Sequence, residues 1–272
     1  MPTPSSESGE CATPVGALPP HPPLLSYSRT GIHREVYVQG LFEEVAPEYE
    51  RMEGFMALGS GSRYRKQALL RAGLAPGDTV LDVGTGTGLL AREALALAGP
   101  QGCVLGVDPS PGMLNEVREP RLQLLRGSAE ALPLPDASCD FLSMGYALRH
   151  LRDVHAAFAE FYRVLCPGGR LLLLEITRPT SLWGRLLLRG HLRVVVPLLG
   201  RFAGCSQASK ELWHYYHETI EACVPPPVIL EALRASGFLD VQRHVEFRCL
   251  SEYMARRPGR TDHPKSLPAQ EE

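Results

Sequence analysis

Apolar residues in the middle of the chain follow two alternating patterns. Short apolar runs predict strands at 79–83, 103–107, 121–125, 139–145 and 170–176. Between them, apolar residues recur every three or four positions and predict helices at 88–98, 110–118 and 153–165. A helix at 226–236 and a strand at 240–247 complete the pattern. Strands separated by helices form right-handed βαβ units, so we predict an α/β fold with a doubly wound, mostly parallel sheet.

The flanking segments depart from this alternation. Residues 36–75 and 180–224 show helical spacing without strands and predict an N-terminal helical cap and a helical insert. Residues 1–35 begin with a stretch rich in Pro, Ser and Gly, which predicts a disordered leader, and 256–272 predict a flexible tail. We therefore expect one domain, 36–255, in a chain too short for two large ones.

The amino-acid composition limits the partners, metal sites and cellular location that we expect. The 28 basic residues are offset by 30 acidic ones in a chain of 272 residues, so no nucleic-acid partner is expected. The seven cysteines form no C-x-x-C pair, and His214 and His217 lack a third ligand, so no metal site is expected. Residues 1–28 contain no Lys or Arg, and no apolar run reaches membrane-spanning length. These features favour a cytoplasmic protein.

A glycine turn follows the first predicted strand. The run 82–88 reads D-x-G-x-G-x-G, whereas a dinucleotide fingerprint counted from Gly84 would need a third glycine where Leu89 stands. The run resembles motif I of the class I S-adenosylmethionine (SAM) methyltransferases, which have a Rossmann-like fold. An acid near the loop can interact with the ammonium group of SAM, directly or through water. The resemblance assigns cofactor contacts to Asp82, Gly84, Thr85, Gly86 and Gly88.

The ends of the next strands carry further polar residues. Asp108 lies 20 residues after Gly88, where an acid can accept hydrogen bonds from both ribose hydroxyls, although it could also cap the next helix. In register with these motifs, the other expected cofactor contacts are Met113, Ser128, Ala129 and Gly145. Ligands bind at the carboxyl ends of parallel strands, so Tyr146, Arg149 and His150 are expected to border the reaction centre.

The chain is similar to the ubiquinone/menaquinone biosynthesis C-methyltransferase family over about residues 41–245. The resemblance is carried by 41–49, 56–59, 80–88, 108–114, 129–136, 148–149, 163–170, 174–179, 197–200 and 218–220. It implies methyl transfer from SAM to a small apolar or aromatic acceptor, such as a quinone precursor. The implied catalytic residues are His150 and Arg149, and the implied acceptor contacts are Tyr49, Tyr146 and Tyr215. His150 is the neutral-range base that can be placed beside the cofactor.

Departures from the family fall mostly at acceptor positions. His150 stands where the family has Asn, Glu53 also replaces Asn, and Gly61 stands near an expected His. Ser128 replaces a polar Asp or Asn at the adenine edge. This pattern supports methyl transfer more strongly than it supports a quinone precursor. Two alternatives remain, an N- or O-methyltransferase of a lipid headgroup or small metabolite, and a non-catalytic SAM-binding protein.

The insert contains Arg185, Arg189 and Arg193 at four-residue spacing among leucines and valines. One interpretation is that 182–202 makes peripheral contact with a membrane, the arginines lying at the phosphates and the apolar residues below them. The alternative is that the same residues form a lid or pack into the core. The sequence does not indicate the oligomeric state.

Overall fold

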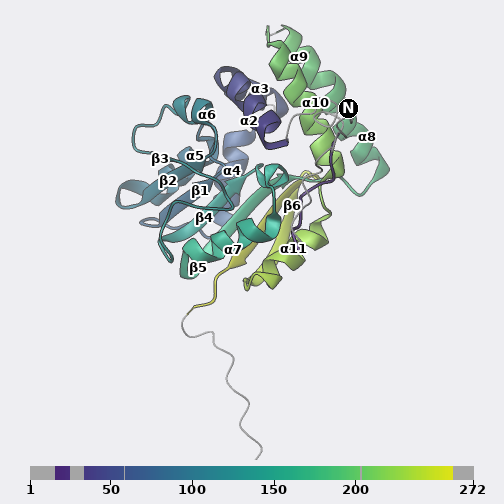
Figure 1. Ribbon diagram of the computed structural model, residues 1–272. Helices are drawn as coiled ribbons and strands as arrows, with labels where there is room; N and C mark the ends of the chain where they lie inside the picture. Colours follow the sequence, from purple (N-terminus) through teal and green to yellow (C-terminus); the bar gives the residue numbers. More distant parts are fainter. Residues whose placement is uncertain (1–15, 25–33, 58, 203, 260–272) are drawn as a thin grey trace, which may run out of the picture.

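The computed structural model describes residues 16–24, 34–57, 59–202 and 204–259. A seven-stranded sheet in the order β3-β2-β1-β4-β5-β7-β6 forms its centre (Figure 1). The strands are β1 (Thr79–Val83), β2 (Cys103–Asp108), β3 (Gln123–Arg126), β4 (Cys139–Gly145), β5 (Leu165–Ile176), β6 (Leu239–Glu246) and β7 (Leu250–Arg256). Neighbours among β1 to β5 pair in parallel, and β7 is antiparallel to both β5 and β6. The predicted doubly wound α/β fold with a mostly parallel sheet is confirmed.

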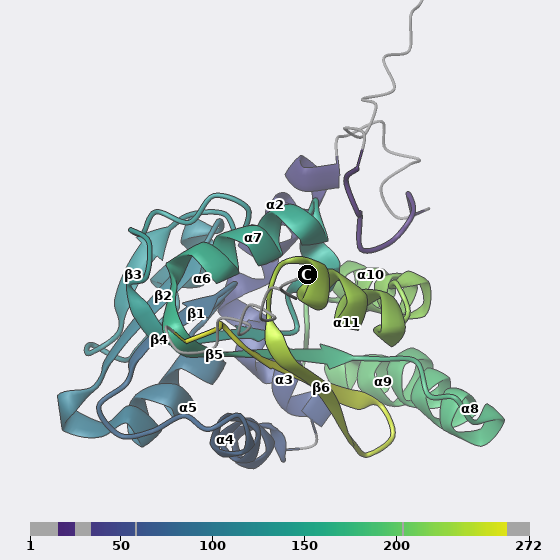
Figure 2. The same ribbon diagram turned by 90° about the horizontal axis from the view of Figure 1, so that it is seen from below.

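Helices cover both faces of the sheet (Figure 2). On one face lie α4 (Gly61–Arg71) and α5 (Leu89–Ala98), and on the other α7 (Val154–Val164) and α11 (Pro226–Ala235). The α5 sequence places Leu90, Ala91, Ala94, Leu95 and Ala98 on one stripe, and all five are buried. These two layers of apolar contact hold the strand ends rigidly in place. The short helix α6 (Pro111–Asn115) and the 3₁₀ turns η2 (Gly99–Gln101) and η3 (Leu148–His150) connect the strands.

The cap and the insert pack against each other beyond the carboxyl ends of the strands. The cap comprises α2 (Arg34–Val45), the 3₁₀ turn η1 (Ala46–Glu48) and α3 (Tyr49–Ala57), whereas α4, which the predicted cap included, packs on the sheet. The insert comprises α8 (Leu182–Gly190), the π-helical turn η4 (His191–Val195), α9 (Val196–Phe202) and α10 (Gln207–Ala222). A separate apolar cluster joins them, with Val45, Met52, Leu212, Tyr215 and Ile220 buried in it. Glu48 accepts hydrogen bonds from Ser206 N–H (3.0 Å) and Ser209 Oγ–H (2.6 Å) at the start of α10.

Three elements differ most from the sequence-based expectation. Strand β5 begins at Leu165, five residues before the expected start at 170, and so contains Pro167, Gly168 and Gly169. Helix α6 ends at Asn115 rather than continuing to 118. Strand β7 was not predicted. It carries Ser251 and Glu252 fully buried, and these polar residues interrupt the apolar pattern that marks a buried strand.

Part of the predicted disordered leader is ordered. Leu18 N–H donates to the Asp153 carboxylate (3.0 Å), Val154 N–H donates to Leu18 O (2.9 Å), and Val224 N–H donates to Pro20 O (2.8 Å). The prediction is therefore wrong for 16–24, where prolines restrict the unfolded chain and lower the entropy lost on ordering, and for 34–35, which begin α2. Residues 1–15 and 25–33 lie outside the described residues. The domain limits 36 and 255 stay predictions, as does the tail beyond residue 259.

Candidate active site

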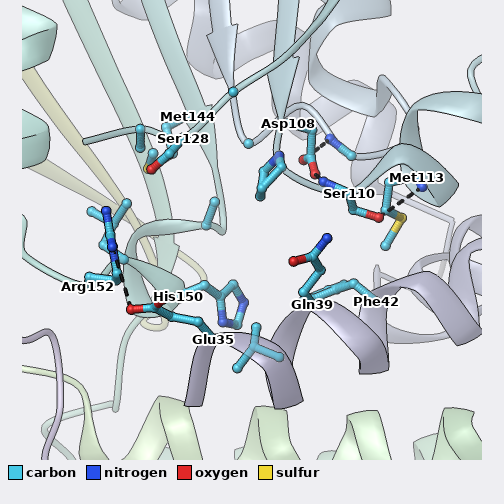
Figure 3. Close-up of a pocket in the computed structure, with 18 of the residues that line it drawn as sticks. Glu35, Gln39, Phe42, Asp108, Ser110, Met113, Ser128, Met144, His150 and Arg152 are labelled. Carbon is cyan, nitrogen blue, oxygen red and sulfur yellow. Dashed lines mark hydrogen bonds and ion pairs between the residues drawn. The ribbon is translucent and has the colours of Figure 1, made fainter. Parts of the chain in front are cut away.

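A cavity of about 390 Å³ opens between α2 and the carboxyl ends of the parallel strands (Figure 3). Its lining comes from α2 (Arg34, Glu35, Val38, Gln39 and Phe42), from Tyr49, and from the strand ends and their loops (Gly84, Gly86, Asp108–Ser110, Met113, Gly127–Glu130, Met144–Ala147 and His150–Arg152). Figure 3 shows Asp108, Ser110 and Met113 on one side and Ser128, Met144 and His150 on the other. The topology thus gathers residues from four strand ends around one space.

The glycine turn shapes one wall of this cavity. Gly84, Gly86 and Gly88 have φ angles of 65°, 56° and 83°, a backbone conformation that L side chains rarely adopt. A Cβ on Gly84 would lie 2.7 Å from the Ala147 side chain, whereas a Cβ on Gly86 would meet nothing within 4 Å. Gly86 therefore presents bare backbone to open space, which is what close contact with a ligand requires. Gly88 instead packs against Val117 and Leu122 and does not line the cavity.

Asp108 holds the turn from the neighbouring strand. Its Oδ2 accepts a hydrogen bond from Gly86 N–H (2.8 Å), and its Oδ1 accepts one from Ser110 N–H (2.9 Å). Burial raises the pKa of Asp108 to about 6. Each carboxylate oxygen retains a second lone pair, so the group can still accept two hydroxyl donors from the cavity.

Asp82 lies deeper, beside a smaller cavity of about 50 Å³ that shares Tyr49, Gly84, Gly86, Gly145 and Tyr146 with the large one. Its carboxylate accepts hydrogen bonds from Thr85 Oγ–H (2.8 Å) and Ser143 Oγ–H (2.6 Å). Burial raises the pKa of Asp82 to about 6. Asp82 and Thr85 line the small cavity, together with the ion pair between Arg65 and Glu53.

His150 forms part of the opposite wall. Its Nδ1 lies 2.9 Å from the Tyr215 hydroxyl, and its ring meets Phe42 edge-on with centroids 5.1 Å apart. The pKa of His150 lies well below its ordinary value of 6.5, first because the ring is buried and then because the positive charges of Arg149 and Arg34 are near. The imidazole is consequently neutral at physiological pH and can accept a proton.

Arg149 and Tyr215 lie behind the cavity wall. Arg149 is buried, forms an ion pair with Glu175, and stacks its guanidinium 4.8 Å from the centre of the Tyr216 ring. Tyr215 is fully buried, does not line the cavity, and contacts the lining residue His150 through its hydroxyl. Neither residue lines the described cavity, so a catalytic role for Arg149 and an acceptor contact for Tyr215 stay predictions. The sequence motifs indicated that both residues lie near the site, but they could not show whether each side chain points into the cavity.

Tyr146 lines both cavities in a strained conformation. Its φ of 61° falls in the left-handed region, which is uncommon for a residue other than glycine. The Tyr146 N–H is held by Leu174 O (2.8 Å), so the surrounding sheet fixes the turn. Backbone strain of this kind concentrates at functional sites. Burial also raises the pKa of Tyr146, which keeps its hydroxyl protonated.

The cap supplies site residues that the sequence did not reveal. Val38, Gln39 and Phe42 of α2 face the cavity, and Glu35 forms an ion pair with Arg152 across its edge (3.7 Å; Figure 3). Helical periodicity places these residues on one face of α2, but it does not indicate which surface that face covers. Met144 is similarly hidden in the apolar pattern of β4.

Comparison with known proteins gives a consistent result. The model of the ubiE/COQ5 methyltransferase family matches residues 30–247. The demethylmenaquinone methyltransferase of Lactiplantibacillus plantarum is 38% identical over 217 residues, covering 75% of this chain and 88% of the relative. The enzyme of the same name from Symbiobacterium thermophilum is 33% identical over 218 residues, covering 76% and 86%.

Solved structures show the same fold. A SAM-dependent methyltransferase from Thermotoga maritima, described as a possible histamine N-methyltransferase, superposes with a TM-score of 0.58 at 23% identity, covering 80% of this chain and 99% of that one. The glycine turn and the strand-end Asp108 both lie within residues 30–247, which the family model matches. The chain belongs to the ubiE/COQ5 methyltransferase family and is a methyltransferase that uses S-adenosylmethionine as its cofactor.

Proposed function

We propose that this enzyme methylates a ring carbon of a small, apolar, quinol-like acceptor. The observation that carries the proposal is that one cavity joins a cofactor-type wall, formed by Gly86 and Asp108, to an apolar wall containing Val38, Phe42 and Met144. Two relatives that are 33% and 38% identical to this chain over the aligned residues are named demethylmenaquinone methyltransferases. A demethylated naphthoquinol is therefore the first acceptor to test.

The residues present fit SAM. The Asp108 carboxylate would accept hydrogen bonds from the ribose hydroxyls, and the bare backbone of Gly86 would lie against the cofactor. Ser128, Ala129 and Met113 would hold the adenine end, and Gly84, Gly145, Asp82 and Thr85, which line the adjoining small cavity, would hold the methionine end. When bound, SAM supplies an electrophilic methyl group on its positively charged sulfur. The protein's own part is to position the acceptor and exclude water.

His150 is the proposed proton acceptor. The hydroxyl proton of the acceptor moves to Nε2, since Nδ1 faces Tyr215, and the O–H electron pair stays on the acceptor. That negative charge makes the neighbouring ring carbon nucleophilic. After methylation the ring-carbon proton leaves to solvent, and its C–H electron pair restores the aromatic ring and returns negative charge to the oxygen. The imidazolium then gives its proton back to that oxygen, so His150 is neutral again. The depressed pKa keeps the imidazole unprotonated before the reaction.

Tyr49 and Tyr146 are proposed to flank the acceptor, because both line the large cavity. Arg149 and Tyr215 act on the reaction only through their neighbours. Tyr215 fixes the His150 ring, and Arg149 holds the Tyr216 ring while its own N–H donates to Glu175 (3.3 Å). We assign them as positioning residues. Drawing an acceptor of this kind from lipid would need peripheral contact with a membrane, which is part of the proposal.

The role of His150 is tested with His150→Gln and His150→Asn, which preserve polarity but cannot take a proton at neutral pH. We expect kcat to fall about 100-fold while the Kd for SAM is unchanged, a loss typical of a missing general base. Exposed His244→Gln is the matched control. Full activity in His150→Asn would exclude His150 as the base.

The acceptor class is tested by incubating enzyme and SAM with a panel of naphthoquinols, benzoquinols, phenols and lipid amines, followed by mass spectrometry. Methylation confined to the quinols supports the proposal. Methylated amines without methylated quinols would replace it with an N-methyltransferase, and binding of SAM without any product would indicate a non-catalytic binder.

A further inference from the structure

The helical arm formed by α8, η4 and α9 carries an exposed apolar face. More than half of the exposed large apolar side chains in the described residues belong to it, namely Leu182, Trp183, Leu186, Leu187, Val194, Val195 and Leu198. Trp183 is 76% exposed and Leu187 74%, and no residue of α8 is buried. Figures 1 and 2 show α8 and α9 at the end of the molecule farthest from β3. The arm thus presents these side chains outward rather than toward the core or the cavity.

Helix geometry collects the apolar residues of α8 on one side. At about 100° per residue, Leu182, Trp183, Leu186 and Leu187 fall within an arc of roughly 140°. Leu188, on the other side, packs against the apolar cluster that joins cap and insert. Such a division is the pattern of a helix that lies along an interface between water and an apolar phase. Tryptophan, with its apolar ring and polar N–H, is enriched at that depth.

The charge of the arm is strongly one-sided. No Asp or Glu occurs between Glu175 and Glu211, whereas the same stretch contains five arginines and Lys210 in a chain of net charge −2. Two of these charges are paired with Glu221, because Arg189 donates to both of its carboxylate oxygens (2.9 and 3.0 Å) and Arg178 lies 3.8 Å from it. Arg193 and Arg201 are exposed and have no carboxylate partner within the described part of the chain.

We propose that the arm of α8, η4 and α9 docks on an anionic lipid surface. Trp183 and Leu187 enter the boundary between headgroups and acyl chains, and Arg193 and Arg201 lie against phosphate groups. Within the described residues, none of the helices has the length and hydropathy of a membrane span. A second copy of the chain is a poorer occupant, because a two-fold interface through this arm would bring the same arginines together.

An ion pair and hydrogen bonds connect the arm to the helices around the cavity. Arg189 holds α8 to Glu221 on α10, and Tyr215 on the same helix contacts His150. At the base of the arm, His191 Nε2 lies 3.1 Å from Met56 O on the cap helix α3. Docking therefore fixes the cap and the cavity relative to the lipid, and this deepens the proposed use of a lipid-soluble acceptor. The docking itself does not depend on which acceptor is methylated.

The test is co-sedimentation of the full chain with vesicles of phosphatidylcholine, with and without phosphatidylglycerol. We expect binding that requires phosphatidylglycerol and decreases with added salt. Arg193→Glu/Arg201→Glu and Trp183→Ser/Leu187→Ser should each reduce vesicle affinity about tenfold or more. The matched controls are Arg118→Glu/Arg121→Glu for charge and Leu70→Ser for exposed apolar area, and both should bind like wild type.

The fluorescence of Trp183 reports directly whether the arm enters the lipid. The chain has two tryptophans, so Trp213→Phe leaves Trp183 as the sole reporter. Its emission should shift to shorter wavelength on anionic vesicles and be quenched by brominated lipid. Unchanged emission, or equal loss of binding in the control variants, would overturn the proposal. If wild type instead self-associates and Trp183→Ser/Leu187→Ser abolishes that association, the face is a dimer interface and lipid docking is wrong. Each variant is also titrated with SAM. Unchanged SAM affinity in a variant that no longer binds vesicles shows that the docking surface, and not the proposed methyl-transfer site, has been altered.

Discussion

At the scale of single residues, the site contains two carboxyl groups in surroundings that disfavour their charge. Asp82 and Asp108 are both buried, and burial raises the pKa of each to about 6. A buried carboxylate without a cationic partner destabilises the fold, so its retention points to a ligand that needs it. Asp108 offers its charge to the cavity, whereas Asp82 is held by two hydroxyl donors from Thr85 and Ser143.

Replacing Asp108 with Ala should weaken SAM binding, because the ribose hydroxyls lose their acceptor and Gly86 N–H loses its partner. We expect a loss of roughly 1.5–3 kcal/mol, about ten- to a hundredfold in Kd. Isothermal titration calorimetry measures it, with the exposed Asp136→Ala as control. An unchanged Kd in a folded Asp108→Ala protein would remove Asp108 from the cofactor site.

The raised pKa of Asp82 predicts how the free energy of unfolding depends on pH. Its folded-state pKa of about 6 exceeds the ordinary 3.8, so the native state binds more protons than the unfolded state between these values. The contribution of this group to stability therefore falls as pH rises from about 4 to about 6, and the loss persists above 6.

Asp82→Asn removes the charge while the two hydroxyls can reorient. It should raise the free energy of unfolding at pH 7.5 by up to about 3 kcal/mol and have little effect near pH 4. Urea denaturation at both pH values measures this. A gain of equal size at both would show that ionisation is not its cause.

At the scale of elements, a buried ion pair joins the turn η3 to strand β5. Arg149 and Glu175 are both almost completely buried, and each is the other's charge partner. This pair positions the main chain that carries His150. Carboxylates of the cap connect further elements. Glu43, for example, accepts a hydrogen bond from Gly112 N–H (2.8 Å) and connects α2 to α6.

Replacing one member of the Arg149–Glu175 pair should lower the free energy of unfolding far more than replacing both. Glu175→Gln leaves the Arg149 charge buried and unpaired, and we expect a loss of about 3–5 kcal/mol in the free energy of unfolding. Arg149→Met/Glu175→Gln should be less destabilised than the sum of the single variants. Chemical denaturation of the four proteins forms a double-mutant cycle. Additive losses would mean that the two charges do not stabilise each other.

At the scale of the whole molecule, the sequence predicted what depends on local pattern. β1 and β4 begin and end where expected, because short apolar runs and the glycine turn mark them directly. The ion pair of Arg149 with Glu175 and the docking of 16–24 beside Asp153 escaped prediction, since they join residues distant in sequence. For the same reason, the sequence placed Arg149 and His150 at the end of the same strand but did not show that Arg149 turns away from the cavity to the buried Glu175, whereas His150 lines it.

The central claim is that SAM and an apolar acceptor meet in this cavity and that a ring carbon receives the methyl group. The most direct measurement is NMR of the product formed from SAM carrying an isotopically labelled methyl group and a demethylated naphthoquinol in anionic vesicles. We predict that the label appears on a ring carbon with wild type and is greatly reduced with Asp108→Ala at the same SAM concentration. Label on oxygen, or no transfer by a wild-type protein shown to bind SAM, would contradict the claim.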